Sequence, residues 1–353
     1  MKKTVRKFAW GILRLGIGLG IILFILTKIN LSEMLAVLHQ CLLQWPWLIV
    51  GTSLSAVCLL IGTERWKIIL DAQGLKMTWS RVFCISLIGQ FFNSFMFGST
   101  GGDLARAYYA AKETHHKKTE AVATVVIDRM IGLVVLTLIA GVMLIARYKF
   151  FIDHPSTHLP ALLMIGMITA IIAGLLIIYN IRFFKGWPIL RFFEYHPKIG
   201  PVIRRMIASI YIYHRRGKVL LKTSLLTLVI HSLIILQCYC FGKSLQINMS
   251  IIDYFTVIPL IICLAAIPIT PGGLGIREGL AVTMLSAFNV GAYQALPLSL
   301  MIYLVSVALS LFGGFIFLGY TAGAGHTVHD EIVELEDETA DENRQIRVPG
   351  AHQ

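Results

Sequence analysis

The feature that most constrains this chain is the grouping of its apolar residues into long uncharged blocks. Several blocks run for about 17 to 23 residues, the length that an α-helix needs to cross a bilayer. The chain of 353 residues is 56% hydrophobic and only 14% charged, whereas a soluble domain carries about 25% charged residues. The blocks leave no stretch long enough for a soluble catalytic domain. The sequence therefore predicts an all-α, polytopic helical membrane protein.

The charge is distributed unevenly along the chain. The net charge is +12, yet residues 326–353 hold eight acids and two bases, so the remainder stands at +18. The basic residues lie in short segments between the apolar blocks, the pattern of cytoplasmic loops that face anionic lipid headgroups. We therefore expect a membrane partner and no nucleic acid. The tail 326–353 lacks apolar periodicity and is predicted to be a disordered cytoplasmic segment.

Loop charge predicts about six spans and their orientation. Basic residues before the first span place the N-terminus in the cytoplasm, and the segment 182–222, with ten bases and one acid, is the strongest cytoplasmic signal. Glu64-Arg65-Trp66-Lys67 is expected at the cytoplasmic end of the second span, with its charges in water and Trp66 at headgroup level. The prediction is a multi-pass protein of the cell membrane with both termini cytoplasmic. The spans run roughly over 10–27, 46–63, 121–146, 160–181, 223–242 and 296–320.

Two further apolar segments do not fit simple spans. Residues 82–98 are long enough to cross, but the segments before and after them are both basic. This favours a re-entrant hairpin that enters from the cytoplasm and turns near residues 98–102. Residues 254–276 are uncharged but contain three prolines and three glycines, and only a short apolar segment follows Arg277-Glu278. They predict a second re-entrant hairpin, entering from outside, because irregular backbone at membrane depth requires a protein or water environment.

The order of these elements predicts an inverted repeat. Two spans, a hairpin and one span make the first half, at about 8–150, which starts inside. The same order makes the second half, at about 158–322, which starts outside. Together they form one integral membrane domain, residues 1–325. Inverted repeats with interrupted helices are typical of transporters, whose ligand sites lie near the midplane of the bilayer.

A short motif occurs once in each half, near the predicted tip of each hairpin. Gly101-Gly102-Asp103-Leu104-Ala105-Arg106 and Gly272-Gly273-Leu274-Gly275-Ile276-Arg277 both read Gly-Gly-x-x-x-Arg. A helix that begins at a glycine turn presents free N–H groups and a partial positive charge, and an arginine one turn later adds a fork suited to phosphate. We therefore predict that Arg106 and Arg277 hold a lipid phosphate. The alternative is structural, with each arginine paired to its neighbour, Asp103 or Glu278.

Two pairs of charged residues complete the candidate site. Asp103 and Glu278 either pair with the arginines, accept a cationic headgroup or carry a coupling proton. Asp128-Arg129, early in the third span, either satisfies itself as an interfacial pair or lines a pathway. The candidate substrate-binding residues are Gly101, Gly102, Asp103, Arg106, Asp128, Arg129, Gly272, Gly273, Arg277 and Glu278.

The chain offers no pattern for covalent chemistry. The six cysteines lie in or beside apolar segments and lack zinc-ligand spacing with nearby histidines, and there is no Walker loop or dinucleotide fingerprint. We therefore expect no metal, no cofactor and no catalytic residue. His231 is interpreted as a core histidine, and Asn93 and Gln90 either bind ligand or cross-link helices. Gly313-Gly314 fits either helix dimerisation or packing within one chain, so an oligomer is left open.

At these residues the chain resembles a known family. Gly101 to Ala107, Asp128-Arg129 followed by Gly132, and Pro271 to Gly279 are similar to the lysylphosphatidylglycerol synthase transmembrane region, also called the flippase-like domain or uncharacterised protein family 0104. The resemblance covers about residues 8–322. In the multiple peptide resistance factor, such a region moves lysyl-phosphatidylglycerol between leaflets, and a separate soluble domain makes that lipid. Because this chain has only an acidic tail of 28 residues there, the resemblance implies translocation rather than aminoacyl transfer.

The sequence thus predicts a flippase-like translocase that moves a phosphate-bearing phospholipid or polyprenyl-linked lipid between leaflets. It is not predicted to be an enzyme. The alternative is a membrane-embedded transferase, or an accessory subunit of a synthase or glycosyltransferase, in phospholipid, glycolipid or polyprenyl-phosphate metabolism. The lipid, the direction of transport and the energy source are left undetermined by the sequence.

Overall fold

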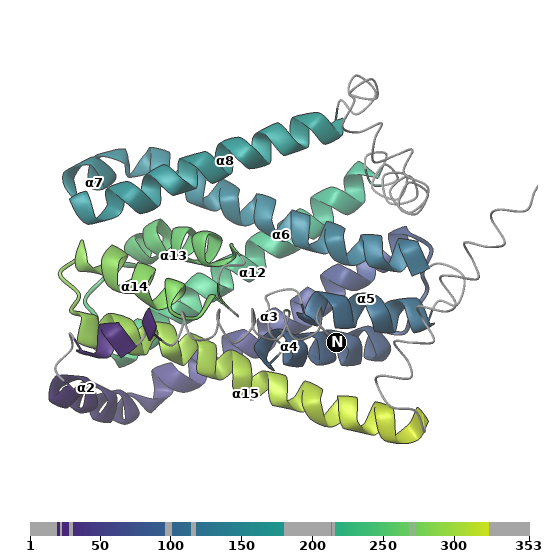
Figure 1. Ribbon diagram of the computed structural model, residues 1–353, viewed down its shortest axis with the longest axis horizontal. Coiled ribbons are helices and arrows are strands. Elements are labelled where there is room, and N and C mark those ends of the chain that lie inside the picture. The colour runs from purple at the N-terminus through teal and green to yellow at the C-terminus, as the bar shows by residue number, and fades with distance from the viewer. Residues whose placement is uncertain are drawn as a thin grey trace, which may run out of the picture.

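The structure, a computed structural model, describes residues 20–21, 23–27, 31–95, 101–113, 118–179, 213, 216–267, 270 and 273–324, which form helices joined by short turns and contain no strand. Figure 1 labels the elements. They are α2 (Leu31–Leu43), α3 (Trp45–Ala72), α4 (Trp79–Phe95), α5 (Gly101–Glu113), α6 (Lys118–Ala146), α7 (Tyr148–Asp153), η1 (Pro155–Thr157), α8 (His158–Tyr179), α12 (Gly217–Ser244), α13 (Ile251–Ala265), α14 (Ile276–Ser286) and α15 (Ala292–Ala324).

Five helices are long and apolar enough to cross a membrane. They cover Trp45–Ala72, Thr119–Ala146, Pro155–Gly174, Gly217–Ser244 and Ala292–Gly319. Each coincides with one predicted span, which confirms the all-α, polytopic architecture. The predicted first span lies largely outside the described residues, and so does the whole acidic tail. Large apolar side chains stay exposed on the long helices, for example Ile145 and Phe315, as expected of surfaces that face lipid.

The second predicted span is longer than expected. Helix α3 does not end at Thr63 but continues to Ala72, because no helix-breaking residue occurs before Gly74. The extra turns pack against α4, α6 and α12. As a result Trp66 is fully buried and Arg65 lies inside the protein, so the prediction that these two residues anchor the helix in water and headgroups was wrong.

Both predicted hairpins are pairs of short helices. Helices α4, α5, α13 and α14 have 17, 13, 15 and 11 residues. At about 1.5 Å per residue these helices are about 16 to 26 Å long, shorter than the hydrocarbon core of about 30 Å. In Figure 1 the pair α4 and α5 lies toward the end where α15 finishes, and the pair α13 and α14 toward the end where α15 begins. The two pairs thus enter the molecule from opposite ends, as the predicted re-entrant topology requires.

The interruption in the second hairpin is more local than the prolines suggested. Helix α13 continues through Pro259 to Ala265, and its start is fixed by a capping box between Ser250 and Asp253. The irregular segment lies between α13 and α14. There Gly273 and Gly275 have φ angles of +71° and +84°, a left-handed conformation that glycine adopts most readily.

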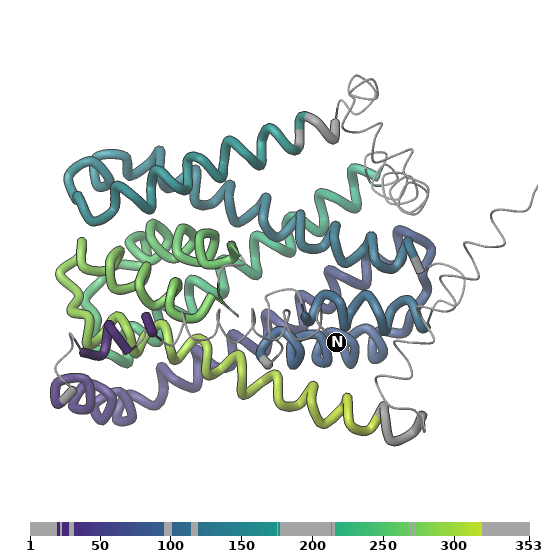
Figure 2. Tube along the Cα trace, viewed as in Figure 1, coloured from purple at the N-terminus to yellow at the C-terminus, as the bar shows by residue number. Residues whose placement is uncertain are grey.

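The core consists of two buried clusters, one around each hairpin. One cluster includes Phe241, Tyr254 and Leu260 beside α13 and α14. The other includes Trp66 and Ile88 beside α4 and α5. Helix α6 contributes to both clusters and runs past both hairpins, as the tube in Figure 2 shows.

The glycine pair of the last helix is used inside the chain. A Cβ on Gly313 would overlap the carbonyl oxygen of Leu87, and one on Gly314 would lie 2.7 Å from the ring of Phe91. The pair therefore lets α15 approach α4 closely. Of the two roles that the sequence left open, helix dimerisation or packing within one chain, the structure shows the second.

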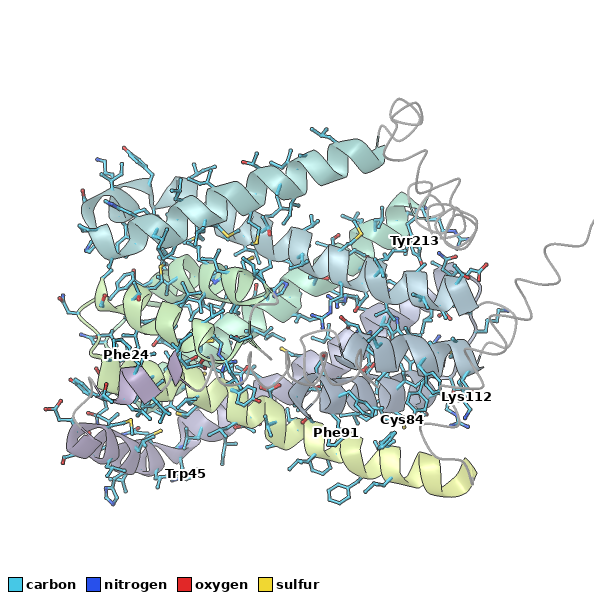
Figure 3. The ribbon with its side chains drawn as sticks, viewed as in Figure 1. Phe24, Trp45, Cys84, Phe91, Lys112 and Tyr213 are labelled. Atoms are coloured by element: carbon cyan, nitrogen blue, oxygen red, sulfur yellow. The ribbon has the colours of Figure 1, made fainter. Side chains whose placement is uncertain are left out.

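The two ends of the molecule differ in the side chains they carry. Figure 3 marks Trp45 and Phe24 at one end and Lys112 and Tyr213 at the opposite end. The second end also holds the start of α12 and the last turns of α5. It is the end for which the sequence predicts a cytoplasmic location.

Candidate functional site

A cavity of about 510 Å³ lies where the two halves of the protein meet. Its walls come from α3, α4, α5, α6, α12, α13 and α15, so both hairpins reach it. The described residues lining it are Ser55, Cys58, Leu59, Gly62, Thr63, Arg65, Ser86, Gln90, Asn93, Arg106, Asp128, Arg129, Gly132, Leu133, Leu136, Ile230, His231, Ile234, Gln237, Ile262, Ala266, Ile302, Ser306 and Leu309.

Asp128 of α6 is the centre of the charged wall of this cavity. Its Oδ1 accepts a hydrogen bond of 2.9 Å from Nε of Arg65, and its Oδ2 accepts one of 3.1 Å from Nη1 of Arg106. Arg65 also donates from Nη1 to the hydroxyl of Thr227 at 2.9 Å. The side chain of Asp128 is 3% exposed and those of the two arginines are 14% exposed. Two nearly buried cations therefore share one carboxylate.

Arg106 is held on several sides, and one nitrogen of its guanidinium has no hydrogen-bond partner among the described residues. Its Cζ lies 4.1 Å from the ring centroid of Trp66, and its aliphatic stem crosses Gly89, where a Cβ would overlap it. The unpartnered nitrogen, Nε, is buried. The edge formed by Nε and Nη2 is the one that binds a carboxylate or phosphate in a fork.

Asp103 and Arg129 form a second ion pair beside the first. Nε of Arg129 donates to Oδ2 of Asp103 at 2.6 Å, joining α5 to α6. Two pairings that the sequence offered as structural alternatives are not formed: Arg106 binds Asp128 instead of Asp103, and Arg129 binds Asp103 instead of Asp128. Asp128 and Arg129 point in different directions around α6, so each meets a partner on another helix. Asp128 faces Arg65 and Arg106, whereas Arg129 faces Asp103.

The glycines of the first motif serve the packing of α4 and α5. Gly101 and Gly102 are both buried. A Cβ on Gly102 would overlap the carbonyl oxygen of Gly89, and the N–H of Gly102 donates to Oδ1 of Asn93 at 3.0 Å. The side chain of Asn93 thus caps the start of α5 and also lines the cavity. Gln90 likewise lines it while donating to the carbonyl of Ser306 at 3.5 Å.

The second motif forms a separate, self-satisfied cluster. Glu278 is fully buried, and its Oε2 accepts a hydrogen bond of 2.6 Å from the N–H of Gly275. Its Oε1 accepts from Arg277 and from the hydroxyl of Ser299 at 3.1 Å. This is the pairing that the structural alternative predicted for the second half. Arg277 and Glu278 are absent from the cavity lining, and Gly272 lies outside the described residues.

Arg65, which lines the cavity, was not singled out as a site residue from the sequence. The same is true of Trp66 and Thr227, which do not line the cavity but contact its arginines. The signal that could have found Arg65 is the absence of a helix breaker before Gly74, which carries the arginine further along a buried helix face. Thr227 is an ordinary polar residue of an apolar helix and carries no such signal.

His231 also lines the cavity, from α12. Its Nε2 lies 3.2 Å from the carbonyl oxygen of Gly132, so it donates there in the neutral tautomer. Its Nδ1 is buried and has no partner among the residues described. The interpretation of His231 as a satisfied core histidine is thus incomplete, because one of its ring nitrogens has no hydrogen-bond partner among the described residues.

The buried acids Asp128 and Glu278 already accept hydrogen bonds from protein groups. Both carboxylate oxygens of Asp128 and of Glu278 accept hydrogen bonds. Within the described part of the chain, no group of three or more His, Cys, Asp or Glu side chains is placed to hold a metal ion. Because Arg65 and Arg106 surround one carboxylate, this wall carries a surplus positive charge, and an anion is the ligand that complements it.

Comparison with known proteins places these features in a family. The sequence profile described as "Lysylphosphatidylglycerol synthase TM region" matches residues 11–314. A UPF0104 membrane protein of Methanocaldococcus jannaschii is 25% identical over 306 residues, covering 84% of this chain and 90% of that protein. A UPF0104 membrane protein of Pyrococcus horikoshii is 23% identical over 326 residues, covering 86% and 95%. No solved structure matches significantly.

Proposed function

The chain belongs to the lysylphosphatidylglycerol synthase transmembrane-region family, and on that premise we propose that it is a flippase-like lipid translocase. In this proposal it moves a phosphate-bearing phospholipid or polyprenyl-linked lipid between the leaflets of the cell membrane. Its termini lie in the cytoplasm, and a synthase or glycosyltransferase supplies or consumes the lipid. The family and the apolar helices support a multi-pass membrane protein with a lipid-related role.

The single observation that carries the proposal is the cavity at the meeting point of the hairpins. Its volume of about 510 Å³ falls within the range of about 300–1,000 Å³ typical of small-ligand sites. It is reached by helices that enter from opposite ends, and its charged wall holds Arg65 and Arg106 around one aspartate. Charged groups at membrane depth are costly and typically mark a pathway or a ligand site.

In this mechanism Arg106 receives the lipid phosphate. The edge of its guanidinium formed by Nη2 and the unpartnered Nε binds two phosphate oxygens, while Asp128 and Trp66 keep the group in place. The acyl chains stay in the bilayer as the headgroup crosses, and the two repeats rock to alternate access. Arg277, whose Nε and Nη2 already bind Glu278, fixes the second hairpin instead of contacting the lipid. A gradient or mass action drives the movement.

The test is leaflet exchange of acyl-labelled fluorescent phospholipids in proteoliposomes that contain the purified protein. We expect wild type to exchange lipid and both Arg106→Ala and Arg106→Lys to exchange it at least about tenfold more slowly. The lysine variant tests the fork, because lysine keeps the positive charge but cannot bind two oxygens side by side. Arg147→Ala is the matched control: Arg147 also pairs with an aspartate, Asp253 at 3.0 Å, but does not line the cavity.

The outcomes separate translocation from its alternatives. Exchange by wild type and Arg147→Ala, lost in both Arg106 variants, supports the proposal. Equal exchange by all four proteins removes the cavity from the mechanism. If wild type moves no phospholipid and no polyprenyl-linked lipid, the translocase assignment falls, and a role as a transferase or as an accessory subunit takes its place.

A further inference from the structure

The charged residues around the cavity indicate which kind of lipid headgroup it can bind. Resting on the proposed function, we infer that the substrate is a lipid whose headgroup is a monoanionic phosphodiester with hydroxyl groups and no amine. The name of the family profile refers to lysylphosphatidylglycerol, a lipid whose headgroup carries positively charged amines. The positive wall of this cavity instead suits a headgroup with a net negative charge.

The first argument is the charge balance of the wall. Arg129 is neutralised by Asp103, whereas Arg65 and Arg106 share Asp128 alone. One positive charge is therefore left over among the described ionic groups at the cavity. A phosphodiester, with one negative charge, brings this balance to zero. A zwitterionic headgroup leaves one charge uncompensated in a region of low dielectric, and a headgroup with two amines leaves two.

The second argument is that an ammonium group finds no free carboxylate. Asp128 is the one acid among the described lining residues, and both of its oxygens already accept from arginines. Asp103 keeps one buried oxygen without a partner, but this residue is not part of the lining and its other oxygen binds Arg129. Burying an amine here would therefore leave it without a counter-ion, which is strongly unfavourable.

The third argument comes from the neutral polar groups of the wall. The hydroxyl of Ser86 and Nδ1 of His231 are buried, line the cavity and have no partner in the described structure. Nε of Arg106 is the third such atom. These atoms come from α4, α12 and α5, so the cavity offers one charged fork and two uncharged hydrogen-bonding groups. That set matches a phosphate together with neighbouring hydroxyls.

The test compares headgroups on the same acyl chains in wild-type proteoliposomes. The labelled lipids are phosphatidylglycerol, phosphatidate, phosphatidylethanolamine and lysyl-phosphatidylglycerol. We expect phosphatidylglycerol to exchange at least about tenfold faster than either amine-bearing lipid, the factor expected for one unpaired charged group, and faster than the phosphomonoester. Equal rates for all four lipids, or the fastest exchange for lysyl-phosphatidylglycerol, overturn the headgroup assignment and leave translocation standing.

A charge variant makes the test independent of overall activity. Arg65→Gln removes the surplus charge, so the preference for phosphatidylglycerol over phosphatidylethanolamine is expected to fall toward one, whereas Arg147→Gln keeps it. A purely structural role of Arg65 would lower all rates by the same factor, and that result overturns the charge argument. Movement of no lipid at all overturns the proposed function itself, as does uptake of soluble glycerophosphoglycerol in place of any lipid.

Discussion

The guanidinium of Arg106 lies over the indole ring of Trp66, with 4.1 Å between Cζ and the ring centroid. The indole is itself fixed, because its Nε1 donates to the hydroxyl of Thr124 at 3.3 Å and the side chain is fully buried. Such a contact stabilises a desolvated cation by roughly 0.5–2 kcal/mol. With Asp128 on one end of the guanidinium, the remaining edge has a fixed direction before any ligand arrives. Preorganisation of this kind lowers the entropic cost of binding.

The shared carboxylate is expected to be a major stabilising element. Asp128→Asn leaves two nearly buried arginines without a counter-ion, and breaking a buried pair costs about 3–5 kcal/mol. Thermal unfolding in detergent should therefore show a large drop in the midpoint. Arg147→Gln is the comparison, because Arg147 is partly exposed and its partner Asp253 keeps its hydrogen bonds to Ser250; loss of this pair should cost about 1 kcal/mol or less. Equal stability of the two variants would contradict the buried ion network.

The approach of α4 to α5 depends on Gly102. Gly102→Ala is expected to push the two helices apart, because the added methyl would overlap the carbonyl oxygen of Gly89. Overpacking of this kind costs about 1–3 kcal/mol. Gly166→Ala, on α8 with open space around the Cβ position, should instead be neutral or stabilise the helix by up to about 1 kcal/mol. The measurement is the thermal unfolding midpoint of each variant. A Gly102→Ala protein with the same midpoint as wild type would refute the close contact between α4 and α5.

The second arginine is expected to act through stability. Arg277→Ala leaves the fully buried Glu278 without its cation and should reduce the yield of folded protein. Arg277→Gln/Glu278→Gln removes both charges and should restore folding and lipid exchange together. If the double variant folds but moves no lipid, Arg277 belongs to the binding site after all.

The predicted orientation can be checked at two exposed aromatic residues. Tyr148 of α7 is 55% exposed and Trp79, at the start of α4, is 38% exposed. A membrane-impermeant thiol reagent added to intact cells should label Tyr148→Cys and leave Trp79→Cys unlabelled until the membrane is opened. The reverse pattern would place the termini outside.

The sequence by itself determined the helical class, the positions of the described spans and the two hairpins. These features follow from local properties, since apolar length, loop charge and glycine or proline breaks act within one segment. Two predictions of this kind still failed at a boundary. Helix α3 runs past Thr63, because no helix-breaking residue follows before Gly74, and α13 continues through Pro259 instead of ending there.

The tertiary structure alone decided the partners of the charged residues. Asp128 binds Arg65, which is 63 positions away in the chain, and Arg106, which is 22 positions away. Adjacent residues in the motifs suggested other pairs for the first half. The partner of a charged side chain depends on the direction in which it points around its helix and on which helix packs there. Neither can be read from the spacing of residues along the chain. The same packing distinguishes two similar arginines: Arg106 lines the cavity and has an unpartnered Nε, whereas Nε and Nη2 of Arg277 both donate to Glu278.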